Sequence, residues 1–146
     1  MRKAGCLAVA AFLTDRAVKI LSAGIPEQGT VLIPGILGLR QARNTGMAFS
    51  LFAGHPVLLG LMSAGIIFGA FLILRGKELR SLTLCGLMLM LGGAAGNLID
   101  RLLSGYVPDM IEFLWTDFAV FNIADACLVI GCGLVILDLI KGEKHG

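Results

Sequence analysis

The chain has 146 residues, of which 57% are hydrophobic and 15% charged, with a mean hydropathy of +0.89 and a formal net charge of +2. A soluble domain of this length needs more charge to cover its surface, so the composition excludes an ordinary soluble protein. Four cysteines without metal-type spacing and two isolated histidines, His55 and His145, give a metalloprotease no ligand set.

Four apolar segments predict an all-α membrane protein whose 146 residues form a single integral-membrane domain. The expected transmembrane helices are residues 4–23, 57–74, 82–99 and 118–137. The second is an unbroken run of 18 uncharged residues, which is typical of a membrane span. Basic residues precede the first segment as in a signal peptide, but charges follow Leu13 where a cleavage region is neutral, so we expect it to be retained.

The second half of the first segment carries Asp15, Arg16 and Lys19. Asp15 and Lys19 are four residues apart, which is the spacing of an ion pair on one helix face. A mutually neutralising pair inside a span is the favoured interpretation, and a catalytic role is the alternative.

Residues 24–56 are too apolar for a solvated connector. Two short apolar runs, separated by Pro34 and Gly35, predict strands at the membrane surface, followed by a turn at residues 44–46. Asn44 either shapes this turn or contacts a substrate.

Two glycine pairs, Gly65 with Gly69 and Gly92 with Gly96, have the spacing that lets membrane helices approach closely. We therefore expect both pairs to pack against neighbouring helices.

Strongly polar residues gather around the third and fourth segments: Asn97, Asp100, Arg101, Asp109, Asn122 and Asp125. A charged residue inside a span costs at least about 2 to 3 kcal/mol, so such residues usually mark function. Asn122 and Asp125 share a helix face, as do Asn97, Asp100 and Arg101. At about 1.5 Å per residue, Asp125 should lie about two turns into its span.

Asp109 can meet Asp125 only if its loop folds back onto the helices. Two carboxylates held close cannot both ionise easily, so one keeps its proton. Such a pair can deprotonate a water and protonate a leaving amine. Alternatively, each aspartate caps a helix or pairs with Arg101.

The distribution of basic residues predicts the orientation. Seven basic residues flank one side of a four-span arrangement, which places both termini and residues 75–81 in the cytoplasm. The longer loops 24–56 and 100–117, together with the polar residues, should then lie at the outer face.

Four stretches of the chain resemble the lipoprotein signal peptidase family, the type II signal peptidases of bacterial membranes. They are DRAVK at 15–19, NTGMAFS at 44–50, GGAAGNLIDR at 92–101 continuing to GYVPDMI at 105–111, and FNIAD at 121–125. They occur in order over almost the whole chain.

The resemblance implies an aspartic endopeptidase of the bacterial cytoplasmic (inner) membrane, with four transmembrane helices, a small outer β-sheet after the first helix, and no cofactor or metal. It implies cleavage of a prolipoprotein signal peptide before a cysteine that carries diacylglycerol. Asp109 and Asp125 would be catalytic, Asp15 and Asp100 would support the fold, and the substrate-binding residues would be Asn44, Asn97, Arg101 and Asn122. The expected partners are the diacylglyceryl-modified prolipoprotein and membrane lipids, without nucleic acid, and the protein should be a monomer.

Two residues depart from the family pattern. Arg16 stands where glutamine is more usual, and we expect this to alter surface contacts only. Pro108 stands where an aliphatic residue is usual, and it removes a backbone donor and restricts Val107.

Two other classes of protein remain as alternatives. A small proton-coupled transporter also needs intramembrane carboxylates, but it should show inverted repeats and polar residues along the whole membrane depth. A structural assembly subunit would use the glycine faces for partners, but it leaves the two aspartates unexplained.

Overall fold

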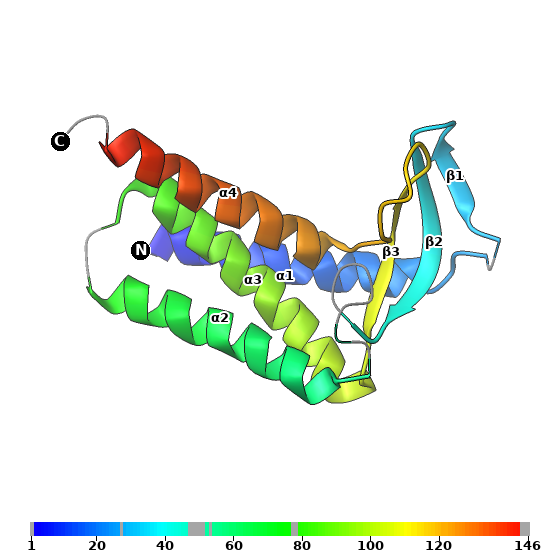
Figure 1. Ribbon diagram of the computed structural model, residues 1–146, viewed down its shortest axis with the longest axis horizontal. Coiled ribbons are helices and arrows are strands. Elements are labelled where there is room, and N and C mark those ends of the chain that lie inside the picture. Colours follow the sequence, from blue (N-terminus) through cyan, green and yellow to red (C-terminus); the bar gives the residue numbers. More distant parts are fainter. Residues whose placement is uncertain (1, 27, 47–51, 53, 77–78, 144–146) are drawn as a thin grey trace.

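The computed structural model describes residues 2–26, 28–46, 52, 54–76 and 79–143. Residues 47–50 of the NTGMAFS stretch lie outside this part of the chain. Four helices run alongside one another: α1 (Arg2–Ser22), α2 (Pro56–Gly76), α3 (Ser81–Ser104) and α4 (Ile123–Glu143). A small sheet lies across one end of these helices, and both termini lie at the other end (Figure 1).

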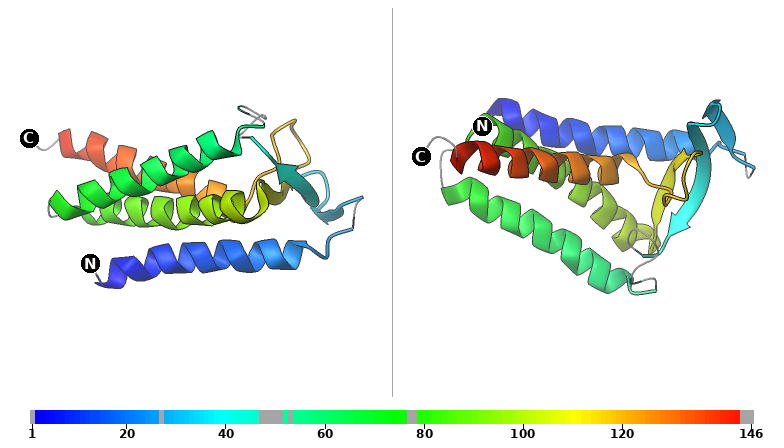
Figure 2. Two further views of the ribbon diagram at one scale, coloured as in Figure 1. Left: turned by 90° about the horizontal axis from the view of Figure 1, so that it is seen from below. Right: turned by 45° about the horizontal axis from the view of Figure 1, so that its top comes forward.

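Helix α3 is the centre of the bundle, since it packs against α1, α2 and α4 (Figures 1 and 2). Its glycines allow the close approach. A methyl group on Gly92 would lie 2.5 Å from the Ala8 carbonyl oxygen of α1, and one on Gly96 would lie 2.6 Å from Asp15 Oδ2. A methyl group added at Gly65 or Gly69 would meet no other described atom within 4 Å, apart from its own helix backbone and chain neighbours. The expected packing role is therefore confirmed for α3 and wrong for α2.

Three helical segments are long and apolar enough to cross a membrane: Val57–Arg75, Ser81–Ser104 and Ile123–Lys141. The protein is therefore a multi-pass membrane protein. Many large apolar side chains point outward from these helices, including Leu61, Phe68 and Val129, which are 65%, 62% and 73% exposed. Helix α1 is as long as α2 but carries three charged residues in its second half, so a fourth span stays a prediction.

The sheet is antiparallel with the order β1 (Thr30–Ile33), β2 (Leu37–Asn44) and β3 (Val107–Phe113). The first two strands confirm the expectation for residues 24–56, and Gly35 takes a positive φ of 71° in the turn between them. The third strand was not anticipated. It belongs to the second long loop and pairs with β2, with Asp109 opposite Ala42 and Pro108 opposite Arg43.

The start of the fourth helix differs from the expected residue 118. Helix α4 begins at Ile123, because the preceding residues are drawn into hydrogen bonding with β3. The backbone nitrogen of Phe121 donates to the Ile111 carbonyl oxygen at 3.0 Å, and the Phe121 carbonyl oxygen accepts from Ile111 at 2.8 Å. Asp125 consequently lies in the first turn of α4, not about two turns into it.

Candidate active site

The loop that carries Asp109 folds back onto the helices, because part of it forms strand β3 and pairs with the segment before α4. One edge of β3 pairs with β2, and the other bonds to Phe121, the residue before Asn122. This arrangement places Asp109 of β3 next to the start of α4. The carboxylates of Asp109 and Asp125, 16 positions apart in sequence, thereby enter one hydrogen-bonded network.

Asn122 connects the two aspartates. Its Nδ2 donates to Asp109 Oδ1 at 2.6 Å, while its Oδ1 accepts from the backbone nitrogen of Asp125 at 2.9 Å. The Asn122 backbone nitrogen donates in return to Asp125 Oδ2 at 3.3 Å. This reciprocal pair is a capping box at the start of α4. The interpretation of Asp125 as a capping residue therefore holds, and it does not exclude a further role for its second oxygen.

That second oxygen, Asp125 Oδ1, accepts a hydrogen bond of 2.8 Å from Asn97 Nδ2 of α3. Asn97 Oδ1 accepts from Asn122 Nδ2 at 3.2 Å. Asn97 and Asn122 are 4% and 0% exposed, so these amides are buried polar groups that the network satisfies.

Asn44 approaches Asp109 from the end of β2. Its backbone is opposite Val107, which makes it a diagonal neighbour of Asp109 on the same face of the sheet, and its Nδ2 donates to Asp109 Oδ2 at 2.8 Å. Asn44 Oδ1 accepts from the backbone nitrogen of Gly46 at 2.8 Å. Asn44 thus shapes the expected turn and also contacts the carboxylate.

Among the residues that the structure describes, Arg101 forms no ion pair with an aspartate, which was the alternative role considered for it. Its Nη2 donates to the Gly46 carbonyl oxygen at 3.1 Å, and its Nη1 donates to the Asn97 carbonyl oxygen at 3.4 Å. Arg101 therefore joins the outer end of α3 to the turn after β2.

Burial and the neighbouring charge of Asp125 together raise the pKa of Asp109 to about 6. Hydrogen bonds from Asn44 and Asn122 and the positive charge of Lys19 oppose this rise. Asp109 is 2% exposed and lies outside the membrane-crossing helices. Asp109 thus holds a proton up to about pH 6, a higher pH than an exposed aspartate does.

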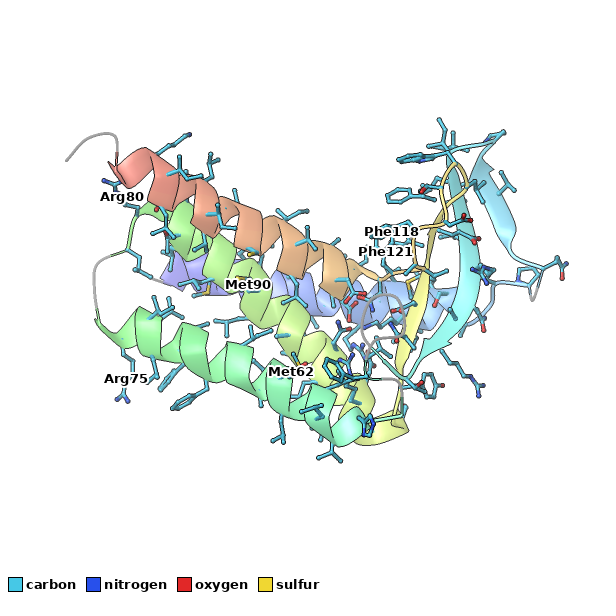
Figure 3. All side chains as sticks on the ribbon, in the orientation of Figure 1. Met62, Arg75, Arg80, Met90, Phe118 and Phe121 are labelled. Carbon is cyan, nitrogen blue, oxygen red and sulfur yellow. The ribbon has the colours of Figure 1, made fainter. Side chains whose placement is uncertain are left out.

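A cavity of about 500 Å³ adjoins the network. Its polar lining consists mainly of Asn44, Asn97, Arg101 and Asp125, whereas Asp109 and Asn122 are buried and do not line it. The rest is largely apolar and comes from α2, α4 and the segment before α4, including Met62, Phe118 and Phe121 (Figure 3). The cavity can therefore hold an apolar group with one polar end beside Asp125.

Four further charged residues lie next to Asn97. Lys19 Nζ is 2.8 Å from Asp15 Oδ2 and 2.7 Å from Asp100 Oδ2, which confirms the expected ion pair on α1 and adds a second carboxylate. Arg16 holds Asp100 with two hydrogen bonds of 2.6 and 2.7 Å. The expectation that Arg16 alters surface contacts only was wrong, because a guanidinium is long enough to reach across to α3.

Asp15 also fastens α1 to α4, since its Oδ1 accepts from the backbone nitrogen of Ala124 at 3.0 Å. It is fully buried. Within the described residues, no group of three or more His, Cys, Asp or Glu side chains could hold a metal ion.

Comparison with known proteins gives consistent similarities. Residues 7–141 match the family described as Signal peptidase (SPase) II. The chain is 36% identical to the lipoprotein signal peptidase of Symbiobacterium thermophilum, over 96% of this chain and 95% of that protein. It is 38% identical to the lipoprotein signal peptidase of Sinorhizobium fredii, over 92% and 84% of the two chains.

A solved structure described as a bacterial membrane enzyme has a similar fold. It superimposes with a TM-score of 0.90 at 28% sequence identity, covering 98% of this chain and 90% of that one.

Proposed function

The chain belongs to the signal peptidase II family and removes signal peptides from prolipoproteins, and we propose that it does so as an aspartic endopeptidase with Asp109 and Asp125 as its catalytic pair. The observation that carries this proposal is the position of Asn122. Its side chain bonds Asp109 at 2.6 Å and caps Asp125 at 2.9 Å, so two carboxyl groups are held in one network beside a cavity.

The two carboxyl groups have different surroundings, which supports different roles. Asp125 lines the cavity, so a water molecule held beside a substrate there can reach its carboxylate, whereas Asp109 does not line the cavity. Asp125 is therefore the general base. Asp109 is more deeply buried and its pKa is raised to about 6, so it is the group that carries the shared proton.

The reaction then balances as follows. Asp125 takes a proton from a water molecule, and the resulting hydroxide oxygen bonds to the scissile carbonyl carbon. Asp109 gives its proton to the amide nitrogen, the carbon–nitrogen bond breaks, and a carboxylic acid and a free amine are formed. Transfer of the acquired proton from Asp125 to Asp109 restores the starting state.

The apolar cavity supports a lipid-modified substrate. We assign it to the acyl chains of a diacylglyceryl cysteine, whose burial contributes about 0.8 kcal/mol per methylene. Of the four residues expected to bind substrate, Asn44, Asn97 and Arg101 line the cavity and would orient the peptide and ester groups around the two aspartates. Asn122 is buried and would act indirectly, by holding Asp109 and Asp125. Cleavage before the modified cysteine follows if the cavity sets the register.

The charge distribution supports an orientation in the bacterial cytoplasmic membrane. Arg75 and Arg80 lie at the end of the bundle that carries both termini, opposite the sheet (Figure 3). Basic residues are retained on the cytoplasmic side, so the sheet and the catalytic pair are assigned to the outer face. A monomer suffices, since one chain contributes every residue of the proposed site.

A digestion experiment tests the substrate assignment. Purified protein in detergent micelles is given two precursors of identical sequence, one diacylglyceryl-modified at the cysteine and one unmodified. We expect the modified precursor to be cut much faster. Mass spectrometry of the two products should show that the cleaved bond is the one immediately before the modified cysteine. Equal rates would reduce the proposal to an intramembrane peptidase that does not recognise lipid.

A further inference from the structure

Four charged side chains next to the proposed catalytic pair take no part in the reaction derived above. They are Asp15, Arg16 and Lys19 of α1 and Asp100 of α3. Asp15, Lys19 and Asp100 are only 0%, 7% and 5% exposed. Two carboxylates and two cations cancel one another, so the cluster as a whole adds no net charge to the helix interior.

Lys19 alone among these residues reaches the catalytic network. Its ammonium group carries three N–H donors and no acceptor. Two of its contacts go to Asp15 and Asp100, at 2.8 and 2.7 Å, and the third goes to Asn97 Oδ1 at 3.1 Å. All three donors are therefore occupied inside the protein.

Asn97 connects Lys19 to Asp125 through hydrogen bonds from both ends of its side-chain amide. Its oxygen faces two donors, Lys19 Nζ and Asn122 Nδ2, and its Nδ2 donates to Asp125 Oδ1 at 2.8 Å. If the amide were turned over, its NH2 group would face two donors and its oxygen would face a carboxylate oxygen. Because an ammonium cannot accept a hydrogen bond, Lys19 acts together with Asn122 Nδ2 to fix which atom Asn97 presents to Asp125.

We propose that Lys19 is a positioning residue for Asp125: through Asn97 it keeps a donor on Asp125 Oδ1 and so holds that carboxylate ionised and fixed beside the cavity. Asp15, one turn away on the same helix, keeps the ammonium in place, and Asp100 and Arg16 complete the charge balance. This inference rests on the proposed function, in which Asp109 and Asp125 are the catalytic pair.

The charge of Lys19 also acts on the pH dependence. The ionisable groups around it come from four elements: Asp15 and Arg16 of α1, Asp100 and Arg101 of α3, Asp109 of β3, and Asp125 of α4. Lys19 lowers the pKa of Asp109. Its removal should therefore move the loss of activity at alkaline pH to a higher pH.

Two matched double variants separate positioning from charge balance. Lys19→Met with Asp100→Asn removes the cation that contacts Asn97 together with one carboxylate. Arg16→Met with Asp100→Asn removes the other cation and the same carboxylate. Both leave one cation beside Asp15, either the part-exposed Arg16 or the buried Lys19, so neither strands an uncompensated charge.

We expect the Lys19 variant to have a kcat reduced about 100-fold, which is the usual order for losing one oriented donor, and a nearly unchanged KM. Its loss of activity at alkaline pH should occur at a higher pH than in the original protein. The Arg16 variant should keep a kcat and a pH profile close to those of the original protein. Equal kcat and equal pH profiles in the two variants, per folded molecule, would overturn the inference and leave Lys19 with charge balance only.

Lys19→Gln and Lys19→Arg cover the case in which the double variants do not accumulate. Glutamine can present either an oxygen or an NH2 group to Asn97, so it should lose activity, whereas arginine only donates and should recover part of it. Glutamine as active as lysine would contradict the inference. Failure of the proposed function itself is distinguishable, because Asp109→Asn or Asp125→Asn would then remain active whatever residue stands at position 19.

Discussion

Asn122 is the residue on which the association of Asp109 with Asp125 depends, because its side chain bonds the carboxylate of Asp109 and caps the helix turn that carries Asp125. Asn122 and Asp125 are three residues apart, and that spacing predicts a shared helix face, but Asn122 lies just before α4 and caps it. The capping box between them follows from the same spacing. The contacts of Asp109 could not be predicted, because they depend on Phe121 pairing with β3 across a loop. Arg16 was misjudged for a similar reason: its partner, Asp100, is 84 positions away.

The raised pKa of Asp109 predicts the pH dependence of cleavage. Asp109 acts in its protonated form and loses that proton as the pH rises through about 6, so kcat/KM should fall on the alkaline side. The apparent value belongs to the coupled pair of aspartates. Measuring kcat/KM against pH in micelles of constant composition tests this. Arg40→Gln, which breaks the exposed ion pair with Glu112 away from the site, is the control and should leave the pH profile unchanged. A rate that climbs steadily into the alkaline range would contradict the assignment of Asp109 as the acid.

The same shift predicts the direction of the stability change. Asp109 binds its proton more tightly in the folded protein than an exposed aspartate, whose pKa is 3.8, so its contribution to stability is fully present below pH 3.8. It is lost as the pH rises through about 6. Asp109→Asn, which cannot ionise, should flatten this part of the stability curve measured by thermal unfolding.

At the scale of whole elements, the helices followed from the sequence better than the sheet did. Long apolar runs predicted α2 and α3 closely, because a membrane span requires about 20 apolar residues in succession. Strand β3 was missed although it contains β-branched and aromatic residues, because Pro108 interrupts the pattern. Proline is tolerated there since it lies near the start of the strand. The start of α4 was misplaced because an apolar run does not reveal where pairing with β3 ends.

The packing of α3 yields a prediction with an internal control. Gly96→Ala should destabilise the protein by about 1 to 3 kcal/mol, because the added methyl group would lie 2.6 Å from Asp15 Oδ2. Gly65→Ala faces open space and should be neutral or slightly stabilising. Thermal unfolding of both variants in one detergent measures the difference. Equal unfolding temperatures would mean that the close contact between α1 and α3 is not rigid.

At the scale of the whole molecule, polar and apolar parts are separated along the bundle axis. The sheet occupies one end and both termini lie at the other (Figure 1). The hydrogen-bonded network joins strands β2 and β3 of the sheet to α3 and to the start of α4. The cavity adjoins the network and continues between apolar residues of α2 and α4. A substrate anchored in one leaflet can therefore offer its polar bond to Asp125 while its acyl chains stay among the helices.

This arrangement predicts the topology in the membrane. A reporter fused after Lys144, or inserted within residues 76–80, should be active only in the cytoplasm, and one inserted at Gln28 should report outside. The prediction also tests whether α1 crosses the membrane, which its charged second half leaves to experiment. Activity of the Gln28 and Lys144 reporters in the same compartment would contradict four spans.

The central claim, that two carboxyl groups carry the chemistry, is tested most directly by replacing each with its amide. Asp109→Asn and Asp125→Asn keep the shape of the side chain but cannot exchange the proton that the reaction moves. Turnover of the diacylglyceryl-modified precursor should fall to background in each variant, while membrane insertion and accumulation stay normal. Turnover close to that of the original protein in either folded variant would contradict the claim.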